Sequence, residues 1–310
     1  MQYENGSPVS FSSHYATPIE DVDIRDDFMF AYVIRNEEIC IELLKYLLPG
    51  HQINRVEYYE LDENGQEVLR PEQPPRDVRL ETQKAIAEAF NRRGVRLDAY
   101  LDDGKTIYNI EMQTTRLPAL PQRARLYQAQ LDINQLQRGQ QYDELRPTFI
   151  IFICTFDPFG RGQYRYSFRN MCEEAPGLVL ADGAHKLFFS TVGTKGEISD
   201  ELRQVLTYIN NPPAAVAEGI RLPLLQKIDE VVGEAKMDDE WRRNYMTYQV
   251  HQRDAELIGR MGGIQDVAQH MLQDGMREDI VARYTGLSLQ DVRSLRHKPP
   301  VTPPPSAGTP

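Results

Sequence analysis

The chain has 310 residues, of which 41% are hydrophobic, and a formal net charge of −11 at pH 7. This length and apolar content suffice for a sizeable core, in one large domain or two smaller ones. The acidic balance argues against passive nucleic-acid binding through phosphate neutralisation, and no apolar run approaches the roughly 18 residues of a membrane span.

The N-terminal part predicts a loose arm followed by two short helices. Residues 1–18 are polar and show no periodicity. Over residues 26–48 the apolar residues recur at helical spacing, with one break at which Asn36 can cap the second helix. A Pro-Gly pair then ends this helix. Residues 52–93 contain a candidate strand, a turn and a Pro-rich stretch, which are typical of a surface excursion.

The central part predicts a hairpin, a helix and a buried strand in that order. The segment GVRLDAYLDDGKTIYNIEMQ, residues 94–113, alternates apolar and polar residues on both sides of an Asp-Asp-Gly-Lys turn. The next stretch begins with Pro, carries apolar residues at helical intervals and reaches Gly139 as its expected stop. TFIIFICTF is typical of a strand buried on both faces, and a turn at 157–160 closes it.

The remainder predicts two more short strands and then mostly helices. RYSFRN and HKLFFSTVG have strand character, and ISDELRQVLTYIN is a helix that Ser199 can cap. Residues 214–274 are dominated by helical patterns. Near the end, two short helices flank Thr-Gly-Leu, with Ser288 as cap and Asp291 three residues later. This pattern predicts a helix–turn–helix.

Two acidic residues share one face of the hairpin if its turn has two residues. Alternate side chains share a face, and the numbers of opposed residues sum to a constant. A turn at 103–104 makes the sum 207 and sets Glu111 diagonal to Asp98, whereas a turn at 104–105 makes it 209 and sets them opposite. Either turn also brings Gln113 to this face, while a loop one residue longer reverses the arrangement unless it adds a bulge.

Opposed carboxylates repel one another, so a partner must offset the cost. The residues alone leave three explanations open. A hard divalent cation such as Mg²⁺ takes carboxylate and phosphate oxygens. A protonated pair can do acid–base work, as in glycosidases. An exposed face with salt bridges to Arg96 or Arg116 needs no chemistry at all.

Cysteine spacing and local charge add two constraints. The three cysteines lie far apart, which predicts neither a disulfide framework nor a zinc site and fits a cytoplasmic protein. Residues 91–138 hold eight Lys and Arg against five Asp and Glu, and residues 241–298 hold nine against seven. Such small local excesses are compatible both with a basic site on an acidic body and with an ordinary solvated surface.

Five segments together resemble one nuclease family. They are DDFMF (26–30), GVRLDAYLDD (94–103), IYNIEMQTT (107–115), RARLYQAQLDINQLQRGQQYDEL (123–145) and PTFIIFICTFDPFG (147–160). In this order they resemble the recombination-promoting nucleases of bacteria, the PD-(D/E)XK nuclease family transposases. The C-terminal GMREDIVARYTGLSLQDVRSL is similar to the helical tail of many members.

The resemblance implies an α/β fold with a PD-(D/E)XK restriction-endonuclease-like core, a mixed sheet flanked by helices, and a helical C-terminal extension. Residues 19–236 are then the nuclease-like domain, and residues 237–297 are a helical region with a helix–turn–helix-like end. A flexible arm (1–18) precedes them, and a disordered Pro-rich tail (298–310) follows.

The resemblance also implies the active residues. Asp98 and Glu111 take the place of the metal ligands for Mg²⁺, for which Mn²⁺ can substitute, and Gln113 takes the water-positioning place. Gln113 departs from the superfamily's usual Lys, whose positive charge a neutral amide lacks, although Gln is usual in this family. Asp27, favoured over Asp26 by its spacing, is the acidic residue of the first helix.

On the helix after the hairpin, Arg123, Arg125 and Gln128 are predicted to contact DNA, whereas Tyr127 is expected in the core. The predicted function is Mg²⁺-dependent DNA endonuclease activity, linked to recombination, mobile elements or defence. The alternative is an inactive nuclease-fold adaptor that binds DNA or protein. A homodimer through the helical C-terminal region is also predicted. No membrane partner is expected.

Overall fold

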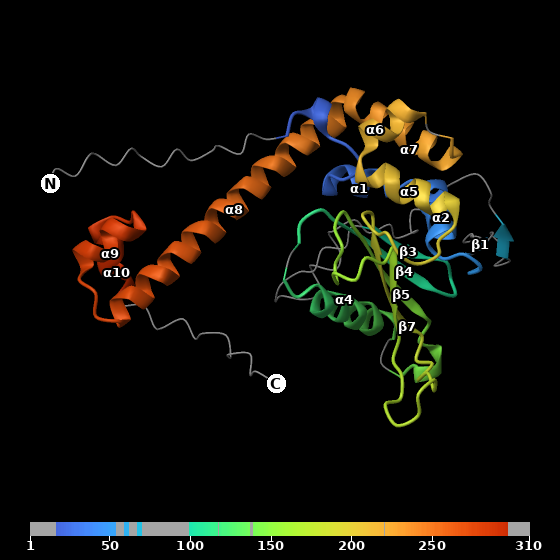
Figure 1. Ribbon diagram of the computed structural model, residues 1–310, viewed down its shortest axis with the longest axis horizontal. Coiled ribbons are helices and arrows are strands. Elements are labelled where there is room, and N and C mark those ends of the chain that lie inside the picture. Colours follow the sequence, from blue (N-terminus) through green and yellow to red (C-terminus); the bar gives the residue numbers. More distant parts are fainter. Residues whose placement is uncertain are drawn as a thin grey trace. The chain divides into compact units, whose positions relative to one another are not determined.

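The computed structural model describes residues 17–53, 59–61, 67–69, 99–116, 118–136, 139–219 and 221–296. The chain forms two compact units, residues 1–239 and residues 240–310. The first unit holds a β-sheet with helices around it, and the second is helical (Figure 1). Among the described residues, no helix has both the length and the apolar character that crossing a membrane requires.

One mixed sheet forms the centre of the first unit, with strand order β3-β4-β5-β7-β6. Its strands are β3 (Ala99–Asp102), β4 (Ile107–Gln113), β5 (Thr148–Cys154), β6 (Arg165–Phe168) and β7 (Ala184–Ser190). The three middle strands run parallel, and the two edge strands are antiparallel to their neighbours. The predicted fold class, a mixed sheet flanked by helices, is confirmed.

Two very short strands, β1 (Tyr59–Leu61) and β2 (Glu67–Leu69), form a separate antiparallel pair. They fall within the segment 52–93, for which a candidate strand was expected. The turn predicted between them lies outside the described residues.

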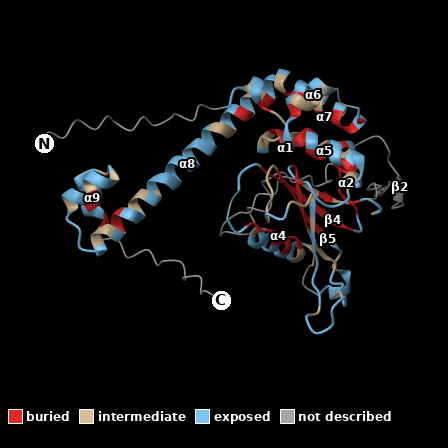
Figure 2. Ribbon diagram, in the orientation of Figure 1, coloured by how far each residue is buried: buried red, intermediate tan, exposed pale blue. Residues whose placement is uncertain are grey.

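Two of the three middle strands, β4 and β5, are buried at every position. A strand covered on both faces needs no polar alternation, which is why β5 is apolar at every position after Thr148. Figure 2 shows buried residues concentrated in these strands and on the inner sides of the helices. Helix α4 (Leu120–Gln135) covers one face through Leu120, Ala124, Tyr127 and Leu131.

The other face lies towards α1 (Asp27–Ile34), α2 (Glu37–Leu47), α5 (Asp200–Asn210) and α7 (Pro223–Met237), which gather on the side away from α4 (Figure 1). Short helices η1 (Ile19–Asp21), η2 (Tyr142–Glu144) and α6 (Pro212–Glu218) complete the unit. The predicted caps are confirmed: Asn36 Oδ1 accepts from the backbone N–H of Ile39, and Ser199 Oγ from that of Leu202.

The β3–β4 hairpin has the second of the two registers considered. Tyr100 pairs with Asn109, so opposed residue numbers sum to 209. The backbone N–H of Asp103 donates to the carbonyl oxygen of Thr106 at 3.1 Å, which leaves two residues in the turn. Gly104, the first of them, has φ of +80°, as turns of this length require. The two-residue turn is therefore confirmed.

Helix α4 ends at Gln135, four residues before Gly139, where its end was expected. The cause is a tertiary contact: Gln135 Oε1 accepts from the backbone N–H of Arg146 at 2.9 Å. Leu136 takes an extended conformation and turns the chain away from the helix axis. The end of α4 is therefore set by the contact with Arg146, which precedes β5, and not by Gly139.

The second unit contains most of α8 (Asp239–Gln273), together with α9 (Glu278–Thr285) and α10 (Leu289–Leu295). Its small core consists of Ala268, Val281, Val292 and Leu295. Gly286 ends α9 at φ of +74°, and Ser288 Oγ accepts from the backbone N–H of Asp291 at 3.1 Å. The predicted helix–turn–helix is confirmed.

Candidate active site

Three alternate positions of β4 place polar side chains in an otherwise apolar layer beneath α4. They are Asn109, Glu111 and Gln113, which are 0%, 1% and 9% exposed. The neighbouring positions in the same layer include Ile150 and Phe152 of β5. A buried polar side chain is costly unless it is bonded, so a run of three needs a specific reason.

Glu111 contacts Asn109 and Arg123 in this layer. Asn109 Nδ2 donates a hydrogen bond to Glu111 Oε1 at 3.1 Å, and Arg123 Nη2 lies 3.9 Å from Glu111 Oε2. A carboxylate taken out of water needs such compensation. The other end of the Asn109 amide, Oδ1, is buried and has no hydrogen-bond partner among the residues that the structure describes. An oxygen acceptor therefore stands beside the carboxylate.

Gln113 is held at both ends of its amide. Arg123 Nη1 donates to Gln113 Oε1 at 2.8 Å, and Gln113 Nε2 donates to the carbonyl oxygen of Met112 at 2.7 Å. These bonds use one of the amide's two N–H donors and one of its two oxygen lone pairs. The orientation of the amide is therefore fixed. Its second N–H and its second lone pair can still form hydrogen bonds, for example with a water molecule.

Arg123 connects these groups from the first turn of α4. Its Nη2 also donates to Tyr127 Oη at 2.7 Å, and its guanidinium carbon lies 5.5 Å from the centroid of the Tyr127 ring. The ring itself stacks on Phe152, as core packing of Tyr127 predicts. We call Asn109, Glu111, Gln113, Arg123 and Tyr127 the Glu111 cluster.

The other predicted site residues lie in different settings. Asp98 lies outside the described residues, although the hairpin register is the one that was predicted to set it opposite Glu111. Asp27 is the first residue of α1 and is exposed. Asp26 caps that helix, because its Oδ1 accepts from the backbone N–H groups of Phe28 and Met29.

The two remaining residues on α4 differ from each other. Arg125 is exposed. Gln128 is buried, and its Nε2 donates to Asp132 Oδ1 and Thr148 Oγ1. The structure thus brings Glu111, Gln113 and Arg123 together and directs the Gln128 amide into the protein.

Asn109 was not among the predicted site residues. The signal that could have found it was present, because strand alternation places it on the same face as Glu111. No pattern in the sequence predicts that the Arg123 side chain points into the protein. This direction depends on the packing of α4 against β4 and β5, which spacing along the chain does not encode.

The donor chemistry of the cluster suits a hard cation. A carboxylate and an amide oxygen are ligands that Mg²⁺ accepts, whereas soft metals prefer sulfur. Cys154, opposite Gln113 on β5, remains a thiol, because burial raises its pKa to about 12 despite the nearby charge of Arg123. Among the described residues, no three His, Cys, Asp or Glu side chains gather to hold a metal.

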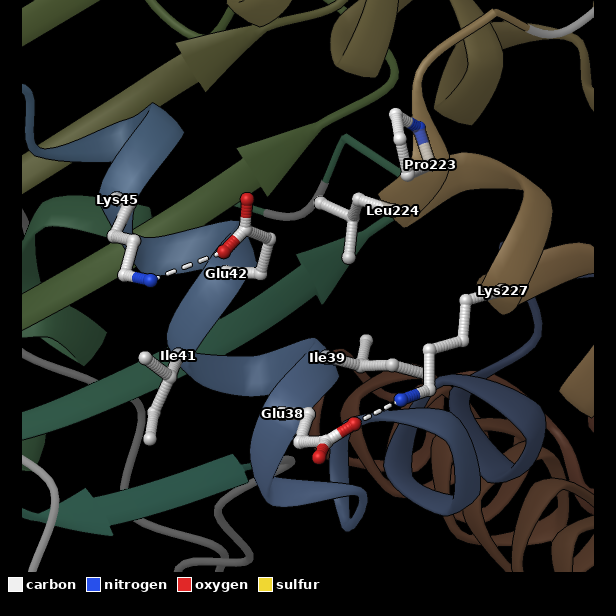
Figure 3. Close-up of a pocket in the computed structure, with 8 residues that line it drawn as sticks. All are labelled: Glu38, Ile39, Ile41, Glu42, Lys45, Pro223, Leu224 and Lys227. Carbon is white, nitrogen blue, oxygen red and sulfur yellow. Dashed lines mark hydrogen bonds and ion pairs between the residues drawn. The ribbon is translucent and has the colours of Figure 1, made fainter.

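A separate pocket of about 320 Å³ lies between α2 and α7 (Figure 3). Its walls combine apolar side chains with two lysines that point to glutamates: Lys45 Nζ donates to Glu42 Oε2 at 3.1 Å, and Lys227 pairs with Glu38. None of the predicted site residues lines this pocket. Its lysines and glutamates are paired with one another.

Comparison with known proteins supports a family assignment. The family model for PD-(D/E)XK nuclease family transposases matches residues 66–257, more than half of the chain. The model for the C-terminal HTH domain of the Rpn/YhgA-like nuclease family matches residues 265–297. In searches of curated proteins and of solved structures, nothing matches the chain.

Proposed function

Since the chain belongs to the PD-(D/E)XK nuclease family transposases, we propose that it is a Mg²⁺-dependent DNA endonuclease whose active site is the Glu111 cluster together with Asp98. The observation that carries the proposal is the buried Glu111 carboxylate beside the Gln113 amide, with Arg123 within reach of both. A merely structural layer beneath α4 would be filled by apolar side chains.

Asp98 and Glu111 would hold the cation, and Asn109 Oδ1 is a further oxygen in the same layer as Glu111. Bound Mg²⁺, or Mn²⁺ in its place, supplies Lewis-acid activation of a phosphoryl oxygen and lowers the pKa of a bound water. Gln113 orients the attacking water through the free positions of its amide. Asp27, exposed at the start of α1 on the side of the sheet away from α4, is proposed as an accessory carboxylate.

Two features support DNA binding: Arg125 on α4 and the helix–turn–helix of the second unit. Arg125 is exposed on α4 and can reach a phosphate, whereas Arg123, 29% exposed at its side chain, is directed to Gln113 and Glu111. The buried amide of Gln128 has no part in this surface. The helix–turn–helix, matched by a family model, supports DNA binding. Recombination, the movement of mobile elements or defence is the role that we propose for the cleavage.

Cleavage of a supercoiled plasmid tests the proposal. The full chain is expected to nick or linearise the plasmid with Mg²⁺ and to lose this activity in EDTA. Glu111→Gln keeps the shape of the side chain but removes its charge, and we expect a loss of about 100-fold or more. Glu197→Gln, on an exposed residue, is the matched control and should cleave normally.

Cleavage that survives EDTA or Glu111→Gln contradicts a metal-dependent site at Glu111. DNA binding without any cleavage by the wild type, at equal thermal stability of all variants, contradicts the enzyme and supports the adaptor instead. Thermal melting by circular dichroism separates a loss of chemistry from a loss of folding.

We also propose a homodimer through the helical C-terminal region and a cytoplasmic location. Exposed apolar side chains on α8, among them Met246, Val250, Leu257 and Met261, support an interface there. Multi-angle light scattering on the full chain should give twice the chain mass. The free thiols of all three cysteines suit a reducing compartment.

A further inference from the structure

The guanidinium of Arg123 occupies the space between the two functional side chains of β4. It donates to Gln113 Oε1 at 2.8 Å and lies 3.9 Å from Glu111 Oε2. Its second hydrogen bond, donated to Tyr127 Oη at 2.7 Å, holds it from the helix side. Three groups on two elements therefore fix the direction of one positive charge.

This position matters because the strand itself carries no cation. Residues 111–113 read Glu-Met-Gln, so the place two residues after the carboxylate has a neutral amide where the general nuclease pattern has Lys. An amide can orient a water, but it brings no formal positive charge to offset the negative charge that develops on a phosphoryl group. Arg123 brings a permanent charge to the same place from α4, since a guanidinium stays protonated.

The placement of Arg123 is unfavourable for the helix alone. The first turn of α4 contains no acidic residue, and a cation near a helix N-terminus opposes the helix dipole. Ala119, which precedes this turn, has φ of +64°, a left-handed conformation that costs roughly 1 kcal/mol for a residue with a Cβ. Contacts within the Glu111 cluster offset these local costs, which is typical of a functional arrangement.

We propose that Arg123 is a positioning residue that fixes the Gln113 amide and supplies the positive charge that Gln113 lacks. This inference rests on the proposed nuclease function and deepens it. Arg123 then acts mainly on the chemical step, whereas the exposed Arg125 acts on DNA affinity. Because its charge lies next to Glu111, Arg123 also opposes a divalent cation there and weakens its binding.

The test compares four full-length variants by single-turnover cleavage, by DNA binding in EDTA and by Mn²⁺ binding followed by electron paramagnetic resonance. Arg123→Met should lower the cleavage rate about 100-fold, change DNA affinity less than about threefold and bind Mn²⁺ about three to ten times more tightly. A merely unfolded site would lose the metal as well.

The other variants separate charge from position. Gln113→Lys combined with Arg123→Met should regain about tenfold or more over Arg123→Met, because the charge returns on β4. Arg125→Met should weaken DNA binding, in contrast to Arg123→Met. Arg221→Met removes a charge from an exposed residue outside the site and should match the wild type in all three measurements.

Tighter Mn²⁺ binding by Arg123→Met supports the inference even if the chain cuts no DNA, an outcome that removes the proposed function alone. Unchanged or weaker Mn²⁺ binding overturns the inference. So does a cleavage rate within threefold of wild type, or a loss that appears entirely in DNA affinity.

Discussion

The backbone N–H of Asp103 and the carbonyl oxygen of Thr106 form a 3.1 Å hydrogen bond that closes the β3–β4 hairpin around a two-residue turn. This bond determines which side chains share the face beneath α4. A slip of one residue would move the whole polar set of one strand to the opposite face. The turn therefore controls the geometry of the candidate active site.

Gly104→Ala should destabilise the first unit by roughly 1–2 kcal/mol, because φ of +80° is strained for a residue with a Cβ. Nothing lies within 4 Å of the added methyl group, so the effect is conformational rather than steric. Urea unfolding measures it. A midpoint equal to that of wild type would contradict the role of this turn.

Asp157 should make the free energy of unfolding depend on pH. Burial acts to raise its pKa, but hydrogen bonds from Tyr166 Oη and from the backbone of Gly162 and Phe159 outweigh this and hold the pKa below its ordinary value. A carboxyl with a lowered folded pKa stabilises above its unfolded pKa of about 4, and the stabilisation is lost as the pH falls through the folded value.

Asp157→Asn is accordingly expected to cost about 1 kcal/mol near pH 7, and the difference from wild type should shrink below about pH 4. Chemical denaturation at several pH values measures this. Asp143→Asn, on an exposed residue, is the control and should show no such pattern. A constant difference between Asp157→Asn and wild type across this pH range would refute the assignment.

Alkylation should distinguish the three cysteines in the native protein. Burial raises the pKa of the Cys40 thiol and of the Cys154 thiol to about 12, so neither forms the reactive thiolate near neutral pH. Cys172 is only half-buried. Iodoacetamide at pH 7.5 should label Cys172 first, as peptide mass spectrometry can show. Rapid labelling of Cys154 would mean that the layer beneath α4 is open to solvent.

A pair of glycine substitutions tests the second unit. Gly286→Ala should cost about 1 kcal/mol or more, because Gly286 ends α9 at φ of +74°. Gly263→Ala, inside α8 with open space around the new methyl group, should instead stabilise by about 0.5–1 kcal/mol. Thermal melting compares the two. Equal shifts in one direction would contradict the helix–turn–helix geometry.

Much of the fold could be predicted because its signals are local. The cap at Asn36, the apolar run of β5 and the Ser288 cap each depend on neighbouring residues alone. The hairpin was restricted to two registers, and the Asp103–Thr106 bond selects between them. The early end of α4 at Gln135 could not be predicted, because it depends on a contact with a residue that follows η2.

The candidate site was predictable along one strand but not across elements. Alternation alone places Glu111 and Gln113 together, and the same rule applied to Asn109 would have added it. The direction of Arg123 differs, because a helical residue can face solvent or sheet according to how the helix is docked. Side-chain contacts across α4 and β4 decide it, and no pattern within either segment contains that information.

The most direct test of the central claim is a crystal of the full chain soaked with Mn²⁺ and measured for anomalous scattering. We predict a single strong peak within coordination distance of the carboxylates of Glu111 and Asp98, absent from Glu111→Gln crystals treated in the same way. An anomalous peak elsewhere, with none beside Glu111, would contradict the proposed active site.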